Sequence, residues 1–168
     1  MRTDALRPLA GRRLLVGVSG SIAAVKTPLL VSSLVKAGAE VRCVVTPSAE
    51  KLVSPLALSS LSRHRCYEDG DGWDSSCSRP LHIELAEWAE LVVVAPLSAS
   101  SLSRWSQGSA DGLLASVLLA CECPVLVAAA MNTAMWNHPA VQDNWERVKH
   151  FPQVVPLDPA AGLLACDR

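Results

Sequence analysis

Four short aliphatic segments recur along the chain, and they limit the possible folds more than any other feature of the sequence. They cover residues 14–18, 41–46, 91–95 and 125–129. Each is largely apolar on both faces, which is typical of strands in a parallel sheet that helices cover on both sides. Helical segments separate them. Right-handed crossovers then predict an α/β fold, a three-layer, doubly wound parallel sheet of the Rossmann or flavodoxin-like type.

The first helix is predicted over residues 21–37, where apolar residues recur near helical spacing and Gly38 provides a stop. Pro28 lies inside this segment and should kink the helix or end its first turns, because proline lacks a backbone N–H. Three further helices are expected, over residues 101–105, 111–120 and 139–149, with Gly108 separating the first two.

Composition excludes several classes of protein. The chain has 168 residues, which we expect to form one domain with an N-terminal tail over residues 1–12. Fifteen Lys and Arg against 16 Asp and Glu leave no basic excess, so no nucleic-acid partner is expected. The apolar runs stay below the ~18 residues of a membrane span, and the first residues lack a signal-peptide core. We therefore expect a cytoplasmic protein without membrane contact.

No metal site is predicted. Cys121 and Cys123, the one close pair among six cysteines, match no common zinc spacing, and most of the cysteines are expected to be core thiols. Residues 67–80 are rich in Asp, Gly and Ser but lack the ligand spacing of an EF-hand. We expect this segment to be a solvated surface loop.

In a sheet of this kind, ligands bind at the carboxyl ends of the strands. Polar residues follow the four predicted strands at these ends. These ends are residues 19–21, 46–48, 96–98 and 130–132, and three of the four offer hydroxyl groups. The first is a glycine turn that opens a helix, an arrangement suited to a phosphate because backbone N–H groups point outward there. Two interpretations stay open at this point, a nucleotide-like cofactor and a plain tight turn.

Four segments are similar to those of one enzyme family. They read VGVSGSIAAVKTPLL from residue 16, LHIELAEWAELVVVAP from 81, AAMNTAMW from 129 and LLACDR from 163. In this order they resemble a flavin-phosphate turn with its helix, a segment with a catalytic histidine, a substrate motif and the start of a substrate flap. From Arg13 to Cys166 the chain thus resembles the homo-oligomeric flavin-containing cysteine decarboxylases.

The sequence also departs from the family pattern. Ala129 stands where the substrate motif begins with proline, and Ser100 and Ser101 stand where the family usually has Asn and Thr. One amide contact to the cofactor is thereby in question. The sequence ends at Arg168, before the glycine-rich remainder of the flap, and it carries no ligase half.

The resemblance implies FMN as cofactor and assigns roles to individual residues. Catalytic roles fall on His82, Asn132 and Cys166, and Met131, Asn132 and Met135 would contact substrate. The implied cofactor-binding residues are Gly20, Ser21, Ile22, Thr46, Ser98, Ser101 and Ala130. Residues 157–168 would begin the substrate flap. Judged by residue type alone, His82 fits an ordinary helix start, Asn132 a helix N-cap and the methionines ordinary packing.

The implied reaction is FMN-dependent decarboxylation of phosphopantothenoylcysteine to phosphopantetheine in coenzyme A biosynthesis, by thiol oxidation, CO2 loss and re-reduction of the enethiol. The partners would be a small cysteine-containing substrate and further copies of the chain, as trimers or as dodecamers built from trimers, with FMN at the subunit interface. Two alternatives are a peptidyl-cysteine decarboxylase that forms a C-terminal enethiol on a ribosomal peptide, and a non-catalytic flavin-binding regulator. A flavin prenyltransferase is disfavoured by the motif around Asn132.

Overall fold

Six parallel strands form the central sheet of the computed structural model, which describes residues 7–157. The strands are β1 (Arg13–Val18), β2 (Glu40–Val45), β3 (Cys66–Tyr67), β4 (Leu91–Leu97), β5 (Val125–Ala129) and β6 (Val154–Leu157). Their order is β3-β2-β1-β4-β5-β6, so the chain winds outward in both directions from the central pair β1 and β4. The predicted doubly wound α/β fold is confirmed.

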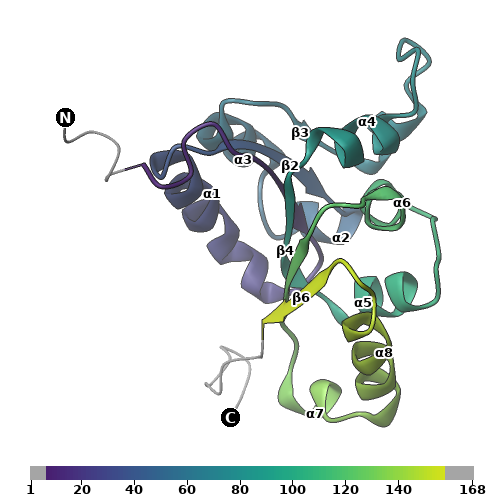
Figure 1. Cartoon of the computed structure of the whole chain (residues 1–168). Coiled ribbons are helices and arrows are strands. Elements are labelled where there is room, and N and C mark those ends of the chain that lie inside the picture. The colour runs from purple at the N-terminus through teal and green to yellow at the C-terminus, as the bar shows by residue number, and fades with distance from the viewer. Residues whose placement is uncertain (1–6, 158–168) are drawn as a thin grey trace.

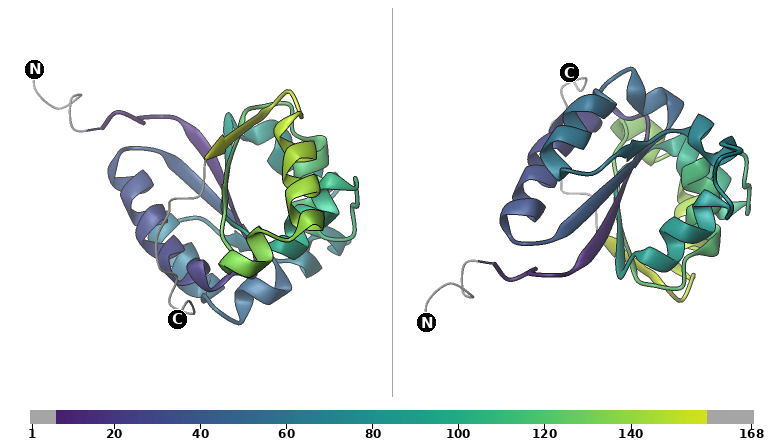
Figure 2. Two further views of the ribbon diagram at one scale, coloured as in Figure 1. Left: turned by 90° about the horizontal axis from the view of Figure 1, so that it is seen from below. Right: turned by 90° about the horizontal axis from the view of Figure 1, so that it is seen from above.

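Helices cover both faces of this sheet and give three layers (Figures 1 and 2). On one face α1 (Thr27–Lys36) and α3 (Pro55–Ser62) pack over β1 and β2, with Val31 and Leu58 in the core. The other face carries α4 (Leu81–Trp88), α5 (Ala99–Ser106), α6 (Leu113–Ala120) and α8 (Pro139–Lys149). Successive residues of β1 point to opposite faces of the sheet. Leu15 therefore packs in the core under α4, α5, α6 and α8, and Val16 packs in the core under α1 and α3.

Gly17 allows α6 to cross close over β1. A Cβ atom at this position would lie 2.6 Å from Cδ1 of Leu114, which is nearly fully buried. The absence of a side chain at Gly17 therefore sets how near α6 comes to the sheet, and α6 begins beside the edge where ligands bind.

The predicted break near Pro28 is confirmed. The chain first forms a short 3-10 helix, η2 (Ile22–Lys26), and α1 then begins at Thr27 with Pro28 in its first turn. Proline is tolerated there because backbone N–H groups in the first turn of a helix have no partner within the helix. Gly38 follows the helix with φ +99°, a conformation that favours glycine. Thr27 Oγ1 donates to the carbonyl of Ala95 at 3.0 Å, which ties the start of α1 to β4.

Several elements were not anticipated. β3 has two residues and β6 four, too few for a periodic signal, and Pro156 is tolerated because β6 is an edge strand. The short helices α2 (Pro47–Glu50) and α7 (Thr133–Trp136) depend on N-caps rather than on apolar periodicity.

The interpretation of residues 67–80 as a solvated loop is wrong for its first half. Tyr67 belongs to β3, and Asp69–Trp73 form a 3-10 helix, η3, closed by a capping box between Glu68 and Asp71. The carboxylate of Asp69 also accepts the N–H of Leu113 at 3.1 Å, which attaches η3 to the start of α6. The second half, from Trp73 to Pro80, is exposed as expected.

Buried cysteines behave as core residues. Cys43, Cys66 and Cys121 are buried, and burial raises the pKa of the Cys66 and Cys121 thiols to about 12. These two thiols therefore stay protonated near neutral pH and are poor nucleophiles. Within residues 7–157 no group of three or more His, Cys, Asp or Glu is arranged to hold a metal ion. None of the helices in the described part is both long and apolar enough to cross a membrane.

Candidate functional site

The carboxyl ends of β1 and β4 are joined by the buried side chain of Ser19. Its hydroxyl donates to the carbonyl of Pro96 at 2.7 Å and accepts the N–H of Ser98 at 2.6 Å. These strands are the pair at which the sheet order reverses, the point where a doubly wound sheet opens a crevice for a ligand. The Ser19 hydroxyl is thus used to hold the two sides of that crevice together.

Three further hydroxyl groups, at the ends of β1, β2 and β4, act as helix N-caps. Ser21 accepts the N–H of Ala23 at 3.4 Å, Thr46 that of Ala49 at 3.3 Å, and Ser98 that of Ser101 at 3.2 Å. Each hydroxyl oxygen is therefore oriented by its own helix, and the N-terminus of the eight-residue helix α5 opens at Ser98.

A cavity of about 270 Å³ lies at this edge of the sheet, and we call it the switch-point cavity. Five of the residues assigned from the resemblance line it together: Gly20, Thr46, Ser98, Ser101 and Met135. A Cβ atom at residue 20 would lie only 2.3 Å from Cβ of Ser48. Glycine is therefore what allows the turn after β1 to approach the turn after β2.

Three charged residues of the cavity were not singled out from the sequence. Arg104, in the last turn of α5, and Asp111, just before α6, form an ion pair with Nε and Oδ2 3.3 Å apart. Asp69 of η3 completes this wall. No local pattern indicated them, because crossing α5, α6 and η3 brings together residues that are distant along the chain.

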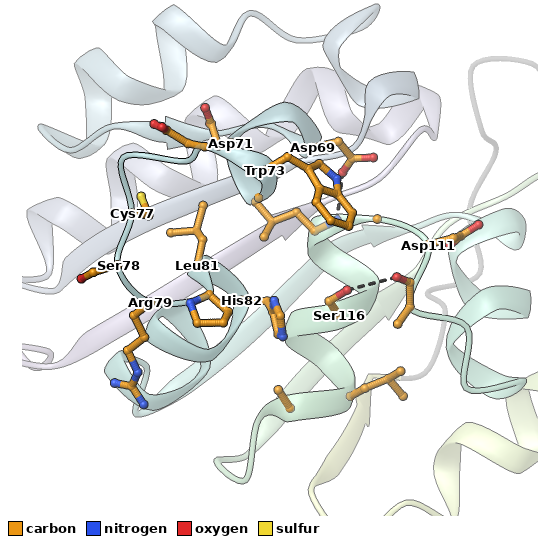
Figure 3. Close-up of a pocket in the computed structure, with 18 residues that line it drawn as sticks. Asp69, Asp71, Trp73, Cys77, Ser78, Arg79, Leu81, His82, Asp111 and Ser116 are labelled. Atoms are coloured by element: carbon orange, nitrogen blue, oxygen red, sulfur yellow. Dashed lines mark hydrogen bonds between the residues drawn. The ribbon is translucent and has the colours of Figure 1, made fainter.

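His82 lies in a different and larger space, the His82 cavity, of about 740 Å³. Figure 3 shows it between α4, the loop before it and α6, with His82, Trp73 and Ser116 on its walls. His82 is in the first turn of α4 and half-buried, and within residues 7–157 its ring has no hydrogen bond or ion pair. The two cavities share Asp69 and Asp111 in their linings.

The other residues assigned from the resemblance do not share one environment. Asn132 caps α7, its Oδ1 accepting the N–H of Ala134 at 2.9 Å, and Ala130 donates its N–H to the carbonyl of Leu97 at 3.0 Å. Met131 is partly buried against the core on the face that carries α4, α5, α6 and α8, whereas Met135 is 48% exposed. Ser21, Ile22, Ala130, Met131 and Asn132 do not line the switch-point cavity. Cys166 and the flap after Leu157 lie outside the described residues.

A doubly wound sheet with a glycine and hydroxyl cradle at its switch point defines a class of α/β proteins that bind a phosphate-bearing ligand there. Within that class the chain belongs to the Flavoprotein family, whose model matches residues 3–168. It is 42% identical over 158 residues to the coenzyme A biosynthesis bifunctional protein CoaBC of Bacillus subtilis (strain 168). That match covers 94% of this chain but only 38% of the relative, so the chain spans well under half of the bifunctional protein.

Two solved structures have a similar fold. A cysteine-to-serine mutant of PPC decarboxylase, complexed with pantothenoylaminoethenethiol, aligns with a TM-score of 0.84 and 36% identity over 93% of this chain and 86% of that one. The FMN-dependent cysteine decarboxylase SpaF aligns with a TM-score of 0.81 and 34% identity, covering 90% of this chain and 87% of SpaF. One of these relatives is thus complexed with an enethiol, and the other is a cysteine decarboxylase that depends on FMN.

Proposed function

We propose that this chain is an FMN-dependent decarboxylase that converts phosphopantothenoylcysteine to phosphopantetheine. The observation that carries the proposal is the switch-point cavity, where Gly20, Thr46, Ser98 and Ser101 meet at one edge of the sheet. The similarity to CoaBC over 94% of the chain, and to PPC decarboxylase in fold, supports the choice of substrate.

The residues of the switch-point cavity fit a flavin mononucleotide. The absence of a side chain at Gly20 lets the turn after β1 lie close against Ser48. Backbone N–H groups of a glycine turn at a helix start are suited to binding a phosphate. Thr46, Ser98 and Ser101 would add hydroxyls around the phosphate and ribityl groups, and the N-terminus of α5 favours negative charge. Ser21, Ile22 and Ala130 remain proposed contacts on the turns that border the cavity.

The chemistry divides between cofactor and protein. Bound FMN would supply a hydride acceptor, so that the CH2–S group of the substrate can become a thioaldehyde and its carboxylate can leave as CO2. His82 would take the proton from the substrate thiol at a ring nitrogen, a task for which its ring has no competing hydrogen bond among residues 7–157. Asn132 would hold the substrate carboxylate without adding charge, and Met131 and Met135 would form apolar walls.

A second copy of the chain would complete this site. His82 and the proposed FMN contacts line different cavities, so one copy does not gather all the groups that the reaction needs. Apolar side chains are also exposed on the side of the sheet that carries α1: Ile22, Val25 and Leu29 along η2 and α1, and Val155 and Leu157 on β6. We therefore propose a homo-oligomer, either a trimer or a dodecamer built from trimers, with FMN at the subunit interface.

We also propose a cytoplasmic location. The five cysteines among the described residues are free thiols, including Cys43 and Cys66, which are neighbours in register on β2 and β3. Free thiols at adjacent strand positions suit a reducing compartment.

The absorption spectrum and the product mass test the proposed function. Purified or FMN-reconstituted protein should show flavin bands, and with phosphopantothenoylcysteine it should yield a product that has lost CO2 alone. A colourless protein that takes up no FMN would refute the assignment. Flavin bands without turnover on any cysteine substrate would instead identify a non-catalytic regulator.

The similarity to SpaF favours one second candidate, a peptidyl-cysteine decarboxylase. The two enzymes would share His82 and Asn132 and differ in the last step. A peptide enzyme would release an enethiol, which has lost CO2 and two hydrogens, and it would act on peptides that end in cysteine. Mass spectrometry with both substrates therefore separates the two functions.

Cys166 is proposed to give the enethiolate its proton in the small-molecule reaction. Cys166→Ser is expected to decarboxylate substrate but to accumulate the enethiol-mass product and reduced flavin, because a serine hydroxyl is far less acidic than a thiol of pKa about 8.5. Product masses and flavin absorbance in one turnover provide the measurement. Fully reduced product at the parental rate would remove Cys166 from the mechanism.

A further inference from the structure

Arg104 is the one Lys or Arg side chain among the described residues that line the switch-point cavity. It follows Ser101 by three residues and Ser100 by four on α5, so the three side chains share one face of the helix. Both serines line the same cavity. A narrow space beside the switch-point cavity is lined by Arg104, Ser101 and Thr46. Because Thr46 directly follows β2, Arg104 extends toward the end of that strand.

Asp111 holds Arg104 at the cavity. The ion pair joins Nε of Arg104 to Oδ2 of Asp111 at 3.3 Å, and both residues line the cavity wall. A guanidinium group carries five N–H donors in a fixed planar fork. An arginine engaged through Nε can still bind an anion with the donors of its two Nη atoms, the geometry that phosphate recognition favours.

The surroundings explain why a cation is needed here. Asp69 and Asp111 both line the cavity, and η3 adds further acidic groups nearby. The pKa of Glu50 is raised, by partial desolvation and then by the carboxylates of Glu68, Asp69 and Asp71. The N-terminus of α6 offsets part of the charge of Asp69 through the N–H of Leu113. A dianionic phosphate entering this edge would still meet repulsion unless a positive side chain faced it.

We infer that Arg104 is the cation that binds the phosphate group of the cofactor, and that Asp111 orients it for this contact. The inference rests on the proposed function, because it takes FMN to be the ligand of the switch-point cavity. It adds a phosphate-selecting residue on α5 to the contacts expected at the glycine turn. Arg104 thereby makes the site select a flavin mononucleotide over riboflavin, which has the same ring and ribityl chain without the phosphate.

Affinities of the flavin-free protein for FMN and for riboflavin, measured by fluorescence titration, test this inference. Arg104→Gln should weaken FMN binding by about tenfold and change riboflavin binding by less than about twofold, because a lost charge-assisted hydrogen bond affects only the ligand with the phosphate. Arg104→Lys, which keeps the charge, should restore part of the preference for FMN. Added salt should reduce that preference in the parent protein more than in Arg104→Gln.

Arg79→Gln is the matched control. Arg79 has the same exposed side-chain fraction as Arg104, 52%, and also pairs with a carboxylate, that of Glu87, but it lines the His82 cavity. Its removal should leave the ratio of the two affinities unchanged. Equal losses of affinity for FMN and riboflavin in Arg104→Gln would show a merely structural role and overturn the inference. Parental affinities for both flavins in this variant would overturn it as well.

The same measurements separate this inference from the proposed function. A parent protein that binds neither flavin refutes both. A parent protein that binds FMN and decarboxylates substrate, while Arg104→Gln retains the full preference for FMN, refutes the role of Arg104 alone.

Discussion

His82→Asn is expected to leave FMN bound but to stop the reduction of the flavin by substrate. The imidazole would remove the thiol proton before the CH2–S group is oxidised, and an asparagine amide cannot accept that proton. A positioned general base contributes about 10²- to 10⁴-fold in rate, so the loss should fall in this range. Single-turnover bleaching of the flavin band under anaerobic conditions measures it directly.

The position of His82 explains why cofactor binding should survive the substitution. His82 lines its own cavity and is not among the residues of the switch-point cavity. Because its ring makes no hydrogen bond or ion pair within residues 7–157, asparagine should not disturb the fold. Flavin reduction at the parental rate would exclude His82 as the base.

Gly20→Ala is expected to produce the opposite defect, a folded protein that binds FMN weakly. The added Cβ would lie 2.3 Å from Cβ of Ser48, so the two turns must move apart. Overpacking of this kind costs about 1–3 kcal/mol, and a displaced cradle should lower FMN affinity by about 10- to 100-fold. Flavin content after purification and fluorescence titration give the measurement.

Ser48→Gly provides the matched control, because it removes the atom that the new Cβ would meet. The double variant Gly20→Ala with Ser48→Gly should recover part of the lost affinity, whereas Ser48→Gly alone should not lose as much as Gly20→Ala. Equal FMN affinity in the parent and in Gly20→Ala would mean that the turn after β1 is not part of the cofactor site.

Together the two variants test whether copies of the chain share their sites. If His82 of one copy serves FMN bound by another, co-expression of His82→Asn with Gly20→Ala, assayed at an FMN concentration too low to fill Gly20→Ala, should yield mixed oligomers with activity that neither variant has alone. Mixed oligomers as inactive as the separate variants would indicate that each copy carries a complete site.

The buried strands and their order of connection could be predicted because each carries enough aliphatic residues to produce a signal. α8 was predicted with its full bounds, and the break at Pro28 follows from proline chemistry alone. β6 escaped detection because a four-residue edge strand with a proline has no distinctive pattern. The 3-10 helix at 69–73 looked like a loop because its stability comes from capping by Glu68 and Asp71 rather than from apolar spacing.

The candidate site was predictable only where it follows the strands. Gly20, Thr46 and Ser98 stand directly at strand ends, so the parallel sheet brings them together. Arg104 and Asp111 belong to the same cavity because two helices cross, and that depends on packing such as the contact of Leu114 at Gly17. The division into two cavities, with His82 in the larger one, likewise arises from tertiary structure and has no counterpart in local sequence.

The buried hydroxyl of Ser19 has a consequence for the thermodynamics of cofactor uptake. Since this one group accepts from Ser98 and donates to Pro96, the ends of β1 and β4 are held together by the folded core itself. The conformational entropy of bringing these two walls together is therefore lost when the chain folds and not when the ligand arrives. A preorganised receptor of this kind keeps more of its contact energy as affinity, because little of that energy is consumed in ordering the protein.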